Sequence, residues 1–445
     1  MQVLRGKYSL SSFQTIIIGF AGTILIGSLL LMLPIASASG KITPFNEALF
    51  TATSATCVTV LVVHDTATYW TLFGQVVILA LIQIGGMGVV TMAALLTILS
   101  GKKIGLMQRN TMQEAISARS MGGIVKLTSF IVKCTILVEC IGAFLMMPVF
   151  CRDFGIGKGI WYSFFHSISA FCNAGFDLMG VQEKYSSLTH YVSNPLINLT
   201  IMGLIIVGGI GFLTWDDIKR KTIHFHRYHT QSKIILSVTF ILILLPTIYF
   251  FFCEFTDMPL KTRILASMFQ AVTPRTAGFN TVDLTKISEP GRLLTIALMV
   301  IGGSPGSTAG GIKTTTIAIL FASALATFHR NEDANVFQRR ISEEALKNAS
   351  AIFMVYVSFV MIGGSIISHI EGFPLLTCLY EAASAVGTVG LTLGITTKIG
   401  VVSQSILIFL MYFGRVGALT LVFATLSPNK RRAKTRMPLA TIAEG

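Results

Sequence analysis

A seven-residue stretch near the start of the chain, Ser54-Ala-Thr-Cys-Val-Thr-Val60, has three related copies further along the sequence. These copies are Ser169-Ala-Phe-Cys-Asn-Ala-Gly175, Val272-Thr-Pro-Arg-Thr-Ala-Gly278 and Ser384-Ala-Val-Gly-Thr-Val-Gly390, and all four align without gaps. Three of the four end in glycine, whereas the first ends in Val60. Such internal repetition indicates that the chain uses one structural unit four times.

Each copy follows a short segment of mixed polarity that lies between two long apolar segments. The short segments lie near 44–57, 158–172, 259–273 and 374–386. With only ~10–15 residues each, they are too short to cross a bilayer as helices. The eight long segments lie near 13–34, 72–98, 126–150, 194–214, 232–253, 292–326, 349–370 and 402–426. The sequence therefore predicts a repeated unit of helix, short half-helix, extended loop and second helix.

The composition defines the class of protein. Apolar residues make up 53% of the chain and charged residues 12%, against about 25% charged residues in soluble domains. Because long apolar runs recur along the whole chain, we expect a membrane protein rather than a soluble enzyme. The net charge of +14 lies in short loops and forms no basic stripe with interleaved aromatic residues, so nucleic-acid binding is excluded. The first run exceeds the length of a signal-peptide core and is predicted to be a retained transmembrane helix.

The basic residues predict the orientation. If the N-terminus is cytoplasmic, twenty-two of the 34 Lys and Arg residues lie in inside segments and ten in outside segments. The excess of positive charge on one side favours a cytoplasmic location for both termini. An even number of long segments agrees with this topology.

The physics of the repeated unit points to a cation pathway. Loop backbone at membrane depth must be buried in protein or line water, because lipid offers it no hydrogen bonds. Four such loops around one axis can replace the hydration shell of a cation with their carbonyl oxygens. Glycine suits these loops because it accepts positive φ angles. The C-terminal ends of the short helices add partial negative charge, so we expect a monovalent cation, K⁺ first of all.

A second motif follows in the next long segment of each unit. It reads Ile84-Gly-Gly-Met-Gly88, Val207-Gly-Gly-Ile-Gly211, Ile301-Gly-Gly-Ser304 and Phe413-Gly-Arg-Val-Gly417. Its glycines allow the second helix to approach the loop closely. Together with the aligned loops, the 302–313 insertion and Arg415, this motif resembles the Trk/Ktr/HKT superfamily of potassium transporters, and most of all its bacterial KtrB-type membrane subunits. The resemblance extends over roughly residues 10–430.

The resemblance implies an all-α membrane protein with four M1–P–M2 repeats, like those of K⁺ channels, around a central pore. Eight transmembrane helices and four re-entrant pore helices are expected. The repeats would occupy residues 1–98, 99–229, 230–330 and 331–427, followed by a cytoplasmic tail at 428–445. The resemblance also implies K⁺ uptake influenced by Na⁺ in the plasma membrane, a homodimer, and gating by a cytosolic ring of nucleotide-binding RCK subunits. ATP or ADP is expected on that ring, and no organic cofactor or enzymatic activity is expected in this chain.

The selectivity-filter residues follow position by position from the aligned loops, and K⁺ is expected at their backbone carbonyls. They are Thr59, Val60, Asn173, Ala174, Gly175, Thr276, Ala277, Gly278, Thr388, Val389 and Gly390. Val60 stands where the family has glycine, or serine in some Na⁺-selective plant members. A β-branched residue is disfavoured at positive φ. Either the first loop is distorted and conducts poorly, or the chain is a natural or engineered variant, and selectivity for K⁺ over Na⁺ stays open.

A glycine-rich run interrupts the sixth apolar segment and is expected to form an intramembrane gate below the filter. The gate residues are Gly302, Gly303, Ser304, Pro305, Gly306, Ser307, Thr308, Ala309, Gly310, Gly311, Lys313 and Arg415. The run does not match the spelling of a phosphate-binding P-loop and has no flanking soluble strand–helix unit. Arg415 lies in mid-membrane, so we expect it to face the protein interior as an electrostatic barrier or as a tether for the gate.

Other polar residues have weaker signals. Glu139, in the third long segment, is expected to pair with a basic group or to make a polar contact. Asp65, Asp177, Asp283 and Glu381 are expected near the outer mouth or on the short pore helices, where they attract cations or remain ordinary solvated carboxylates. The histidines His224, His226 and His229 lie in a basic loop and are interpreted as part of a solvated contact surface. The seven cysteines show no metal-binding spacing and are interpreted as buried apolar residues.

Three classes of function compete. A K⁺-conducting, channel-like transporter is favoured because four units of the same direction suit a pore around a pseudo-fourfold axis. A Na⁺-coupled or Na⁺-selective carrier with alternating access is the alternative, since broken helices also occur in carriers. A membrane-embedded enzyme is disfavoured because no paired acids or nucleophile triad is found in the apolar segments.

Overall fold

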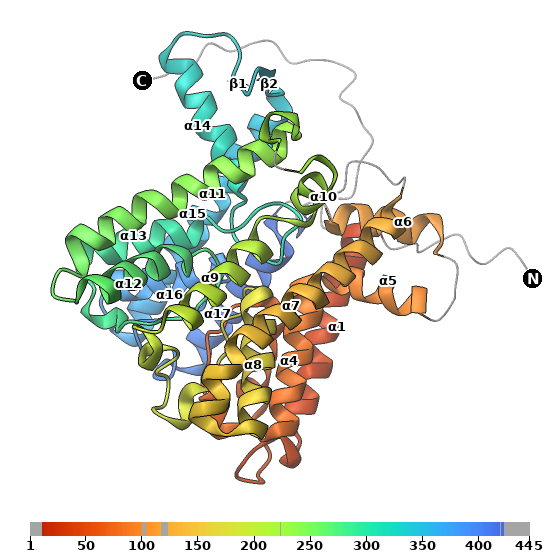
Figure 1. Ribbon diagram of the computed structural model, residues 1–445. Helices are drawn as coiled ribbons and strands as arrows, with labels where there is room; N and C mark the ends of the chain where they lie inside the picture. The colour runs from red at the N-terminus through yellow and green to blue at the C-terminus, as the bar shows by residue number, and fades with distance from the viewer. Residues whose placement is uncertain (1–10, 100–103, 117–122, 223, 419, 422–445) are drawn as a thin grey trace, which may run out of the picture.

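The computed structural model describes residues 11–99, 104–116, 123–222, 224–418 and 420–421 of the 445 residues (Figure 1). The predicted tail at 428–445 lies outside the described residues. Within them the chain is almost entirely helical, with one two-stranded antiparallel hairpin. The predicted all-α class is therefore confirmed at the level of secondary structure.

One order of elements is found four times along the chain: a long helix, a short helix, a loop and a second helix. The long first helices are α1 (Ser12–Met32), α7 (Ile124–Phe154), α11 (Thr230–Tyr249) with a π-helical extension (Phe250–Glu254), and α15 (Glu343–Glu371). The short helices are α2 (Phe45–Cys57), α8 (Ile156–Phe171), α12 (Leu260–Val272) and α16 (Leu375–Gly387). The second helices are α4 (Leu72–Met87) with α5 (Val89–Leu99), α9 (Pro195–Gly209) with α10 (Phe212–Lys221), α13 (Glu289–Val300) with α14 (Thr314–Phe328), and α17 (Val401–Val416).

Smaller elements connect these units. They are α3 (Thr66–Tyr69), α6 (Leu106–Ile116), the strands β1 (Asn335–Val336) and β2 (Arg339–Arg340), and the 3₁₀ turns Pro34–Ala36, Met179–Val181, Thr189–Tyr191, Phe225–Arg227 and Leu284–Lys286. In the hairpin Asn335 pairs with Arg340 and Val336 with Arg339. The hairpin lies with α14 at one end of the molecule (Figure 1).

Local sequence explains where the short helices begin. Pro44, Pro259 and Pro374 stand directly before α2, α12 and α16, where a fixed φ and a missing N–H group cost nothing. Gly155, at φ +81°, separates α7 from α8. A proline or a glycine therefore separates each of these short helices from the preceding segment, in agreement with the short segments predicted from the sequence.

The second helices are not plain spans. The pair α4 and α5 is bent by 98° at Gly88, and the pair α9 and α10 by 96° near Gly211. Gly88, Gly211 and Gly417 have φ angles of +87°, +90° and +90°, and each is the last glycine of the second motif. The long apolar segments expected at 72–98 and 194–214 are thus each divided by a bend. The expected interruption in the sixth segment is found between α13 and α14.

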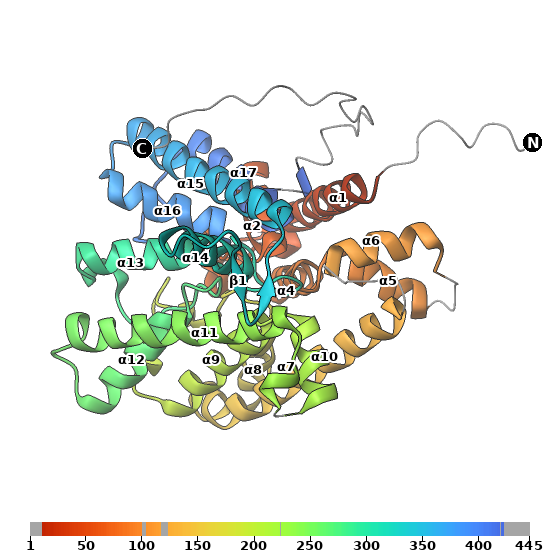
Figure 2. The same cartoon turned by 90° about the horizontal axis from the view of Figure 1, so that it is seen from above.

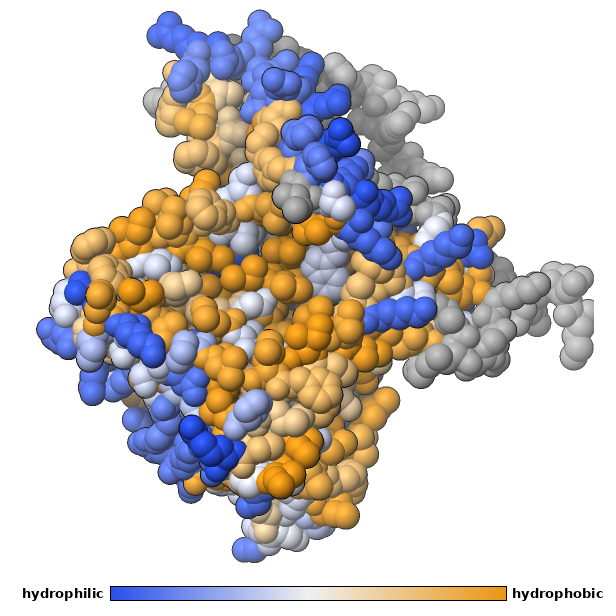
Figure 3. Space-filling view, viewed as in Figure 1, coloured by the Kyte–Doolittle hydropathy of each residue, from blue (hydrophilic) through white to orange (hydrophobic). Residues whose placement is uncertain are grey.

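Length and hydropathy single out the helices able to cross a membrane. Among the described residues, the four first helices qualify alone, and the two bent pairs raise the number to six if each pair is one span. The helices α14 and α17 are apolar but shorter. Hydrophobic residues cover the middle of the face over α7, α9 and α11, and hydrophilic residues gather at both ends (Figure 3). The chain is an integral membrane protein with several apolar helices.

The units contact one another in a closed order. The second helix of one unit packs against the short helix of the next: α4 on α8, α9 on α12, α13 on α16, and finally α17 back on α2. Figure 2 shows these helices following one another around the molecule. Because the last contact returns to the first unit, the four loops that follow the short helices are gathered at the centre.

Candidate functional site

The four aligned loops share one unusual backbone conformation. Two positions of each loop have positive φ, with a single residue between them. These positions are Val58 and Val60, Asn173 and Gly175, Thr276 and Gly278, and Thr388 and Gly390. The residues between them, Thr59, Ala174, Ala277 and Val389, are fully buried. The backbone thus alternates in the same way in all four copies, although most of the side chains differ.

The loops touch each other around a ring. A Cβ atom added to Gly175 would lie 2.1 Å from the carbonyl oxygen of Ala277, and one added to Gly278 would lie 2.2 Å from that of Val389. A Cβ atom on Gly390 would lie 1.9 Å from the carbonyl oxygen of Thr59. Real Cβ atoms do not approach oxygen this closely, so the three glycines are required by space as well as by φ. Backbone oxygens of three copies therefore crowd against the neighbouring loops.

Val60 occupies the fourth place in this ring and has φ +67°. The expectation that valine is disfavoured there rests on the Cβ sterics of the left-handed region, which costs roughly 1–2 kcal/mol. The structure keeps the ring conformation in spite of this cost. Val60 is half-buried and lines the cavity outside the ring, together with Gly278 and Gly390.

Two side chains behind the loops support them, and the sequence analysis did not identify this role. His166 of α8 lies nine positions before Gly175, and its Nε2 accepts a hydrogen bond from the amide of Leu178 at 3.3 Å. Glu381 of α16 lies nine positions before Gly390 and accepts hydrogen bonds from the Thr392 and Thr396 hydroxyls. Of the two expected places for Glu381, the outer mouth or a short helix, the structure has the second: Glu381 lies on α16, fully buried behind the fourth loop. Both residues stand at the same distance before the loop glycine of their unit, and this spacing could have revealed their shared role.

A cavity of about 880 Å³ opens on one side of the ring. Asp65, Asp177 and Asp283 line it. Asp65 also caps α3 and accepts a hydrogen bond from the amide of Tyr185 at 3.1 Å. Asp283 is exposed and accepts hydrogen bonds from Thr285.

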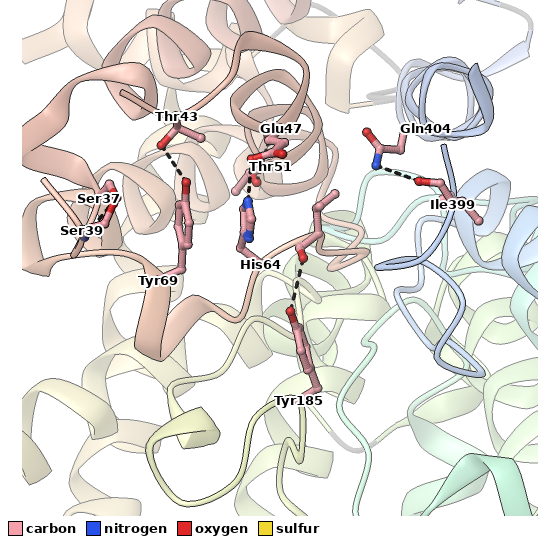
Figure 4. A network of polar contacts seen from close by, with 11 residues as sticks. Ser37, Ser39, Thr43, Glu47, Thr51, His64, Tyr69, Tyr185, Ile399 and Gln404 are labelled. Carbon is pink, nitrogen blue, oxygen red and sulfur yellow. Dashed lines mark hydrogen bonds and ion pairs between the residues drawn. The ribbon is translucent and has the colours of Figure 1, made fainter. Parts of the chain in front are cut away.

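Side chains fasten the segment that follows the first loop to neighbouring segments (Figure 4). His64 Nε2 lies 2.6 Å from the Glu47 carboxylate, and its ring stacks on Tyr69 at 3.8 Å between centroids. The Tyr185 hydroxyl donates to the carbonyl of Val63 at 3.2 Å. These contacts hold the chain that directly follows Val60.

The glycine-rich run forms a loop against the side of the ring that faces away from the 880 Å³ cavity. The Thr308 hydroxyl donates to the carbonyl of Phe171 at 3.1 Å and lies 3.4 Å from Asn173 Oδ1. A Cβ atom on Gly310 would lie 2.0 Å from the Thr388 hydroxyl. The 302–311 loop is therefore in contact with the second and fourth loops, where a gate below a filter is expected to lie.

Backbone hydrogen bonds tie the 302–311 loop to the bend between α9 and α10. The amide of Ser304 donates to the carbonyl of Gly209 at 3.0 Å, and the amide of Phe212 donates to that of Gly306 at 2.8 Å. At the loop's own base, Gly302 and Ile312 are joined at 2.9 Å. The loop is thus an ordered structure with partners on the second unit.

Arg415 and Lys313 are the basic groups beside the 302–311 loop. The Arg415 guanidinium donates to the carbonyls of Thr308 and Gly85, and to that of Gly86 at 2.9 Å. Lys313 Nζ donates to the carbonyl of Ala309 at 2.8 Å. Both residues line a cavity of about 300 Å³ below the loop. The expected interior position of Arg415 is what the structure has, with carbonyl oxygens as its partners.

The remaining candidates from the sequence are Glu139, the three loop histidines and the cysteines. Glu139 is buried and accepts a hydrogen bond from the Gln83 amide at 3.3 Å, so it makes a polar contact rather than an ion pair. Within the described part of the chain, no cluster of three or more metal-binding side chains exists, the three loop histidines included. Each of the seven cysteines is free.

The first glycine of the second motif allows close packing in three of the four copies. Cβ atoms on Gly85, Gly208 and Gly414 would lie 1.9, 2.1 and 2.0 Å from the carbonyl oxygens of Thr56, Phe171 and Val386. These oxygens hold equivalent places near the ends of α2, α8 and α16. In these three units glycine is needed so that the second helix can pack against its own short helix.

Comparison with known proteins matches this geometry. The TrkH family model, described as a cation transport protein, matches residues 7–432. The potassium/sodium uptake protein NtpJ of Enterococcus hirae is 39% identical, over 99% of each chain. The Ktr system potassium uptake protein B of Bacillus subtilis is 39% identical, over 92% of each chain. The crystal structure of the potassium transporter TrkH from Vibrio parahaemolyticus has the same fold, with a TM-score of 0.75 and 17% identity over 96% of this chain and 87% of that one.

Fold and site thus define an integral membrane cation transporter and not an enzyme. The chain belongs to the Trk/Ktr family of cation transport proteins, as the match of nearly its whole length and the 39% identity to uptake proteins demonstrate.

Proposed function

We propose that this chain is the membrane subunit of a K⁺ uptake system and that its four aligned loops form one selectivity filter. The single observation that carries the proposal is the closed order of contacts, in which α17 of the last unit returns to α2 of the first. A closed order gives the four loops one common axis. Their repeated φ alternation supports carbonyl oxygens that face that axis and replace the hydration shell of K⁺.

In the proposed architecture each unit is an M1–P–M2 repeat. The short helices α2, α8, α12 and α16 are re-entrant pore helices, and the first and second helices make eight membrane crossings. Both termini are cytoplasmic, as the distribution of basic residues favours. The 880 Å³ cavity is then the outer vestibule, and its carboxylates raise the local concentration of cations.

The proposed gate is the 302–311 loop, held closed by Arg415. Its contacts with Thr388 and Phe171 support a position across the path that leaves the filter. The guanidinium is tied to backbone carbonyls of the first unit and of the loop. A fixed positive charge at this level opposes the passage of a cation, so opening requires the loop and Arg415 to move together.

Control of this gate is assigned to partners. One relative is named as part of a Ktr system, which supports assembly with further components. We propose a cytosolic RCK-type ring that binds ATP or ADP, a homodimer of two pores, and Na⁺ as a modulator. The helices α10 and α14 start at the bend and at the 302–311 loop, where the amides of Phe212 and Thr314 donate to Gly306 and Gly303. A ring that moves the far, cytoplasmic ends of these helices would therefore act on the gate.

Tracer uptake into liposomes tests the proposal. Purified protein is reconstituted, and uptake of K⁺ or Rb⁺ is compared with that of Na⁺, with and without the ATP-loaded cytosolic partner. The proposal predicts K⁺-selective uptake that the partner increases. Absence of selective monovalent-cation uptake under every condition would contradict it.

A Na⁺-selective or Na⁺-coupled carrier with alternating access is the second candidate. It is favoured by Val60, which replaces glycine in one quarter of the ring, and by the name of the potassium/sodium uptake relative. The two functions differ in their dependence on the gradient. A carrier predicts K⁺ uptake that stops when Na⁺ is removed from the outside, whereas a pore predicts K⁺ uptake that continues.

A further inference from the structure

A cavity of about 610 Å³ lies away from the proposed ion pathway, between the N-terminal part of α7, α10 and the start of α11. Four basic side chains line it: Lys126 of α7, and Lys219, Arg220 and Lys221 of α10. The acidic residues of its wall are Asp216 and Asp217. Basic charge therefore exceeds acidic charge in a hollow built from two different units.

The ion pairs in this cavity use only part of the basic charge. Arg220 pairs with Asp216 at 2.9 Å, and Lys221 pairs with Asp217 at 3.1 Å. Asp217 also accepts hydrogen bonds from the amide of His229 and the hydroxyl of Ser232. Among the described residues, neither Lys126 nor Lys219 has a carboxylate within 4.0 Å. Both are exposed, so two positive charges remain available to an anion.

The position of Lys219 suits an amphipathic ligand. Its ammonium lies 4.4 Å from the centroid of the Phe130 ring, on α7, which fixes it at the boundary between apolar and polar surface. Beyond this boundary, Leu137 of α7 and Leu245 of α11 are 60% and 61% exposed. In Figure 3 the hydrophilic residues around α10 border the hydrophobic surface over α7 and α11. Acyl chains would lie on this surface below a headgroup held by the lysines.

We propose that this cavity binds the phosphodiester headgroup of an anionic phospholipid from the cytoplasmic leaflet, with Lys126 and Lys219 as its main contacts. Charge complementarity and the adjoining apolar faces select a lipid over a soluble anion, because a soluble anion gains nothing from exposed leucines. We name this set of residues — Lys126, Phe130, Lys219, Arg220 and Lys221 — the α7/α10 pocket.

The α7/α10 pocket is connected to the proposed gate through one short helix. The helix α10 begins at Phe212, whose amide donates to Gly306 of the 302–311 loop at 2.8 Å. A Cβ atom on the preceding Gly211 would lie 2.7 Å from the carbonyl oxygen of Pro305. A lipid that holds α10 in place therefore also stabilises one position of the gate loop. This regulatory step rests on the proposed function, whereas the binding of lipid does not.

Lipid retention tests the site directly. The full-length protein, its Lys126→Gln/Lys219→Gln variant and a control variant of equal charge, Lys158→Gln/Lys261→Gln, are purified and mixed with phosphatidylglycerol or phosphatidylcholine. Bound lipid is counted by native mass spectrometry. Each lysine near a membrane surface contributes about a fivefold gain in affinity, so the pocket variant is expected to bind phosphatidylglycerol roughly twentyfold more weakly. The control variant is expected to bind it like the wild type.

Several results would overturn the proposal. Equal retention of phosphatidylglycerol by all three proteins, or an equal loss in both variants, would exclude a specific lipid site. Displacement of the lipid by excess inorganic phosphate would assign the pocket to a soluble anion. A pocket variant that keeps its lipid but no longer binds the cytosolic partner would assign the surface to a protein contact.

Uptake separates the regulatory step from the proposed function. K⁺ uptake is compared between vesicles of phosphatidylcholine and vesicles with equal parts of phosphatidylcholine and phosphatidylglycerol. The anionic lipid is expected to change uptake by the wild type and the control variant, but not uptake by the pocket variant. An unchanged lipid response in the pocket variant would contradict the coupling to the gate. If no protein takes up K⁺ in any vesicle while lipid retention still differs, the proposed function fails and the lipid site stands.

Discussion

The ring of four loops and the layer of helix breaks beneath it differ in how closely the four units agree. In the ring every unit has the same two positive φ angles, even though Val60 must adopt one of them. Beneath it, two units have bends at Gly88 and Gly211, the third has the 302–311 loop, and the fourth carries Arg415. Under the proposed function, this difference fits a ring that is constrained by one shared task and a layer beneath it that is specialised for control.

The largest expected effect comes from breaking the ring at its tightest point. A Gly390→Ala substitution places a Cβ atom 1.9 Å from the Thr59 carbonyl oxygen and 2.6 Å from Val60 Cβ, so the first and fourth loops must separate. We expect selective K⁺ uptake to fall by more than about tenfold, since a distortion of this size costs well over 1.4 kcal/mol. Rb⁺ uptake and the K⁺/Na⁺ ratio in liposomes measure it.

The matched control for this change is Gly394→Ala, four residues further along the chain. Gly394 has φ +85°, but no atom lies within 4 Å of an added Cβ. It therefore reproduces the backbone strain without the steric conflict. Equal losses of uptake in the two variants would mean that strain alone, and not the closed ring, explains the requirement for glycine.

The layer beneath is tested next by Arg415→Gln. This change removes the positive charge and the bonds to Thr308 and Gly86, and charge-assisted hydrogen bonds contribute about 1.5–3 kcal/mol each. We expect partner-independent uptake to rise about tenfold or more, with K⁺ selectivity preserved because the ring is untouched. Uptake without the cytosolic partner measures the effect.

Arg415→Lys separates charge from tether in that experiment. A lysine keeps the positive charge but lacks the planar fork that reaches carbonyls of two units. Uptake by this variant should lie between those of the wild type and Arg415→Gln. A fall in uptake in both variants would show that Arg415 supports the open pathway and would reverse its proposed role.

Restoring symmetry in the ring is expected to have a moderate effect. Val60→Gly removes a strain of roughly 1–2 kcal/mol at a residue with φ +67°. We expect a higher melting temperature in detergent and a severalfold higher K⁺/Na⁺ uptake ratio. If the melting temperature rises and the uptake ratio does not, Val60 affects only the stability of the protein. The first loop then does not discriminate between K⁺ and Na⁺.

The smallest expected effect lies outside the ring. Asp283 is exposed at the outer cavity, and hydrogen bonds from Thr285 hold the pKa of its carboxyl below the ordinary value. Since the pKa is lowered, the negative charge persists through mildly acidic solution. We expect Asp283→Asn to reduce uptake by less than about twofold at low ionic strength and not at high salt, because screening removes long-range attraction.

Much of the fold could be predicted because each repeat unit is defined by features that are close together in the sequence. Hydropathy and length locate the first and short helices, and the prolines before α2, α12 and α16 set their starts. The bends at Gly88 and Gly211 could not be predicted from hydropathy, because a glycine within an apolar run leaves the run apolar whether its φ is negative or positive. The break in the third unit was predictable, since Pro305 and several glycines cannot continue a helix.

The site divides in the same way. The loop residues could be named from their alignment, and the interior place of Arg415 from the cost of a charge in lipid. The sequence left Glu381 either near the mouth or on a short helix, because its partners, Thr392 and Thr396, are brought to it only by the turn of the chain after Gly390. The closure of α17 on α2 joins units more than three hundred residues apart, which no local pattern reports.

The central claim, that the four loops coordinate cations on one axis, is tested most directly by the scattering of a heavy K⁺ substitute. Crystals of the protein grown with Tl⁺ or Rb⁺ should give anomalous peaks in single file, each surrounded by backbone oxygens from the loops ending at Val60, Gly175, Gly278 and Gly390. An ordered ring without any peak on its axis, or with cations bound only elsewhere, would contradict the account.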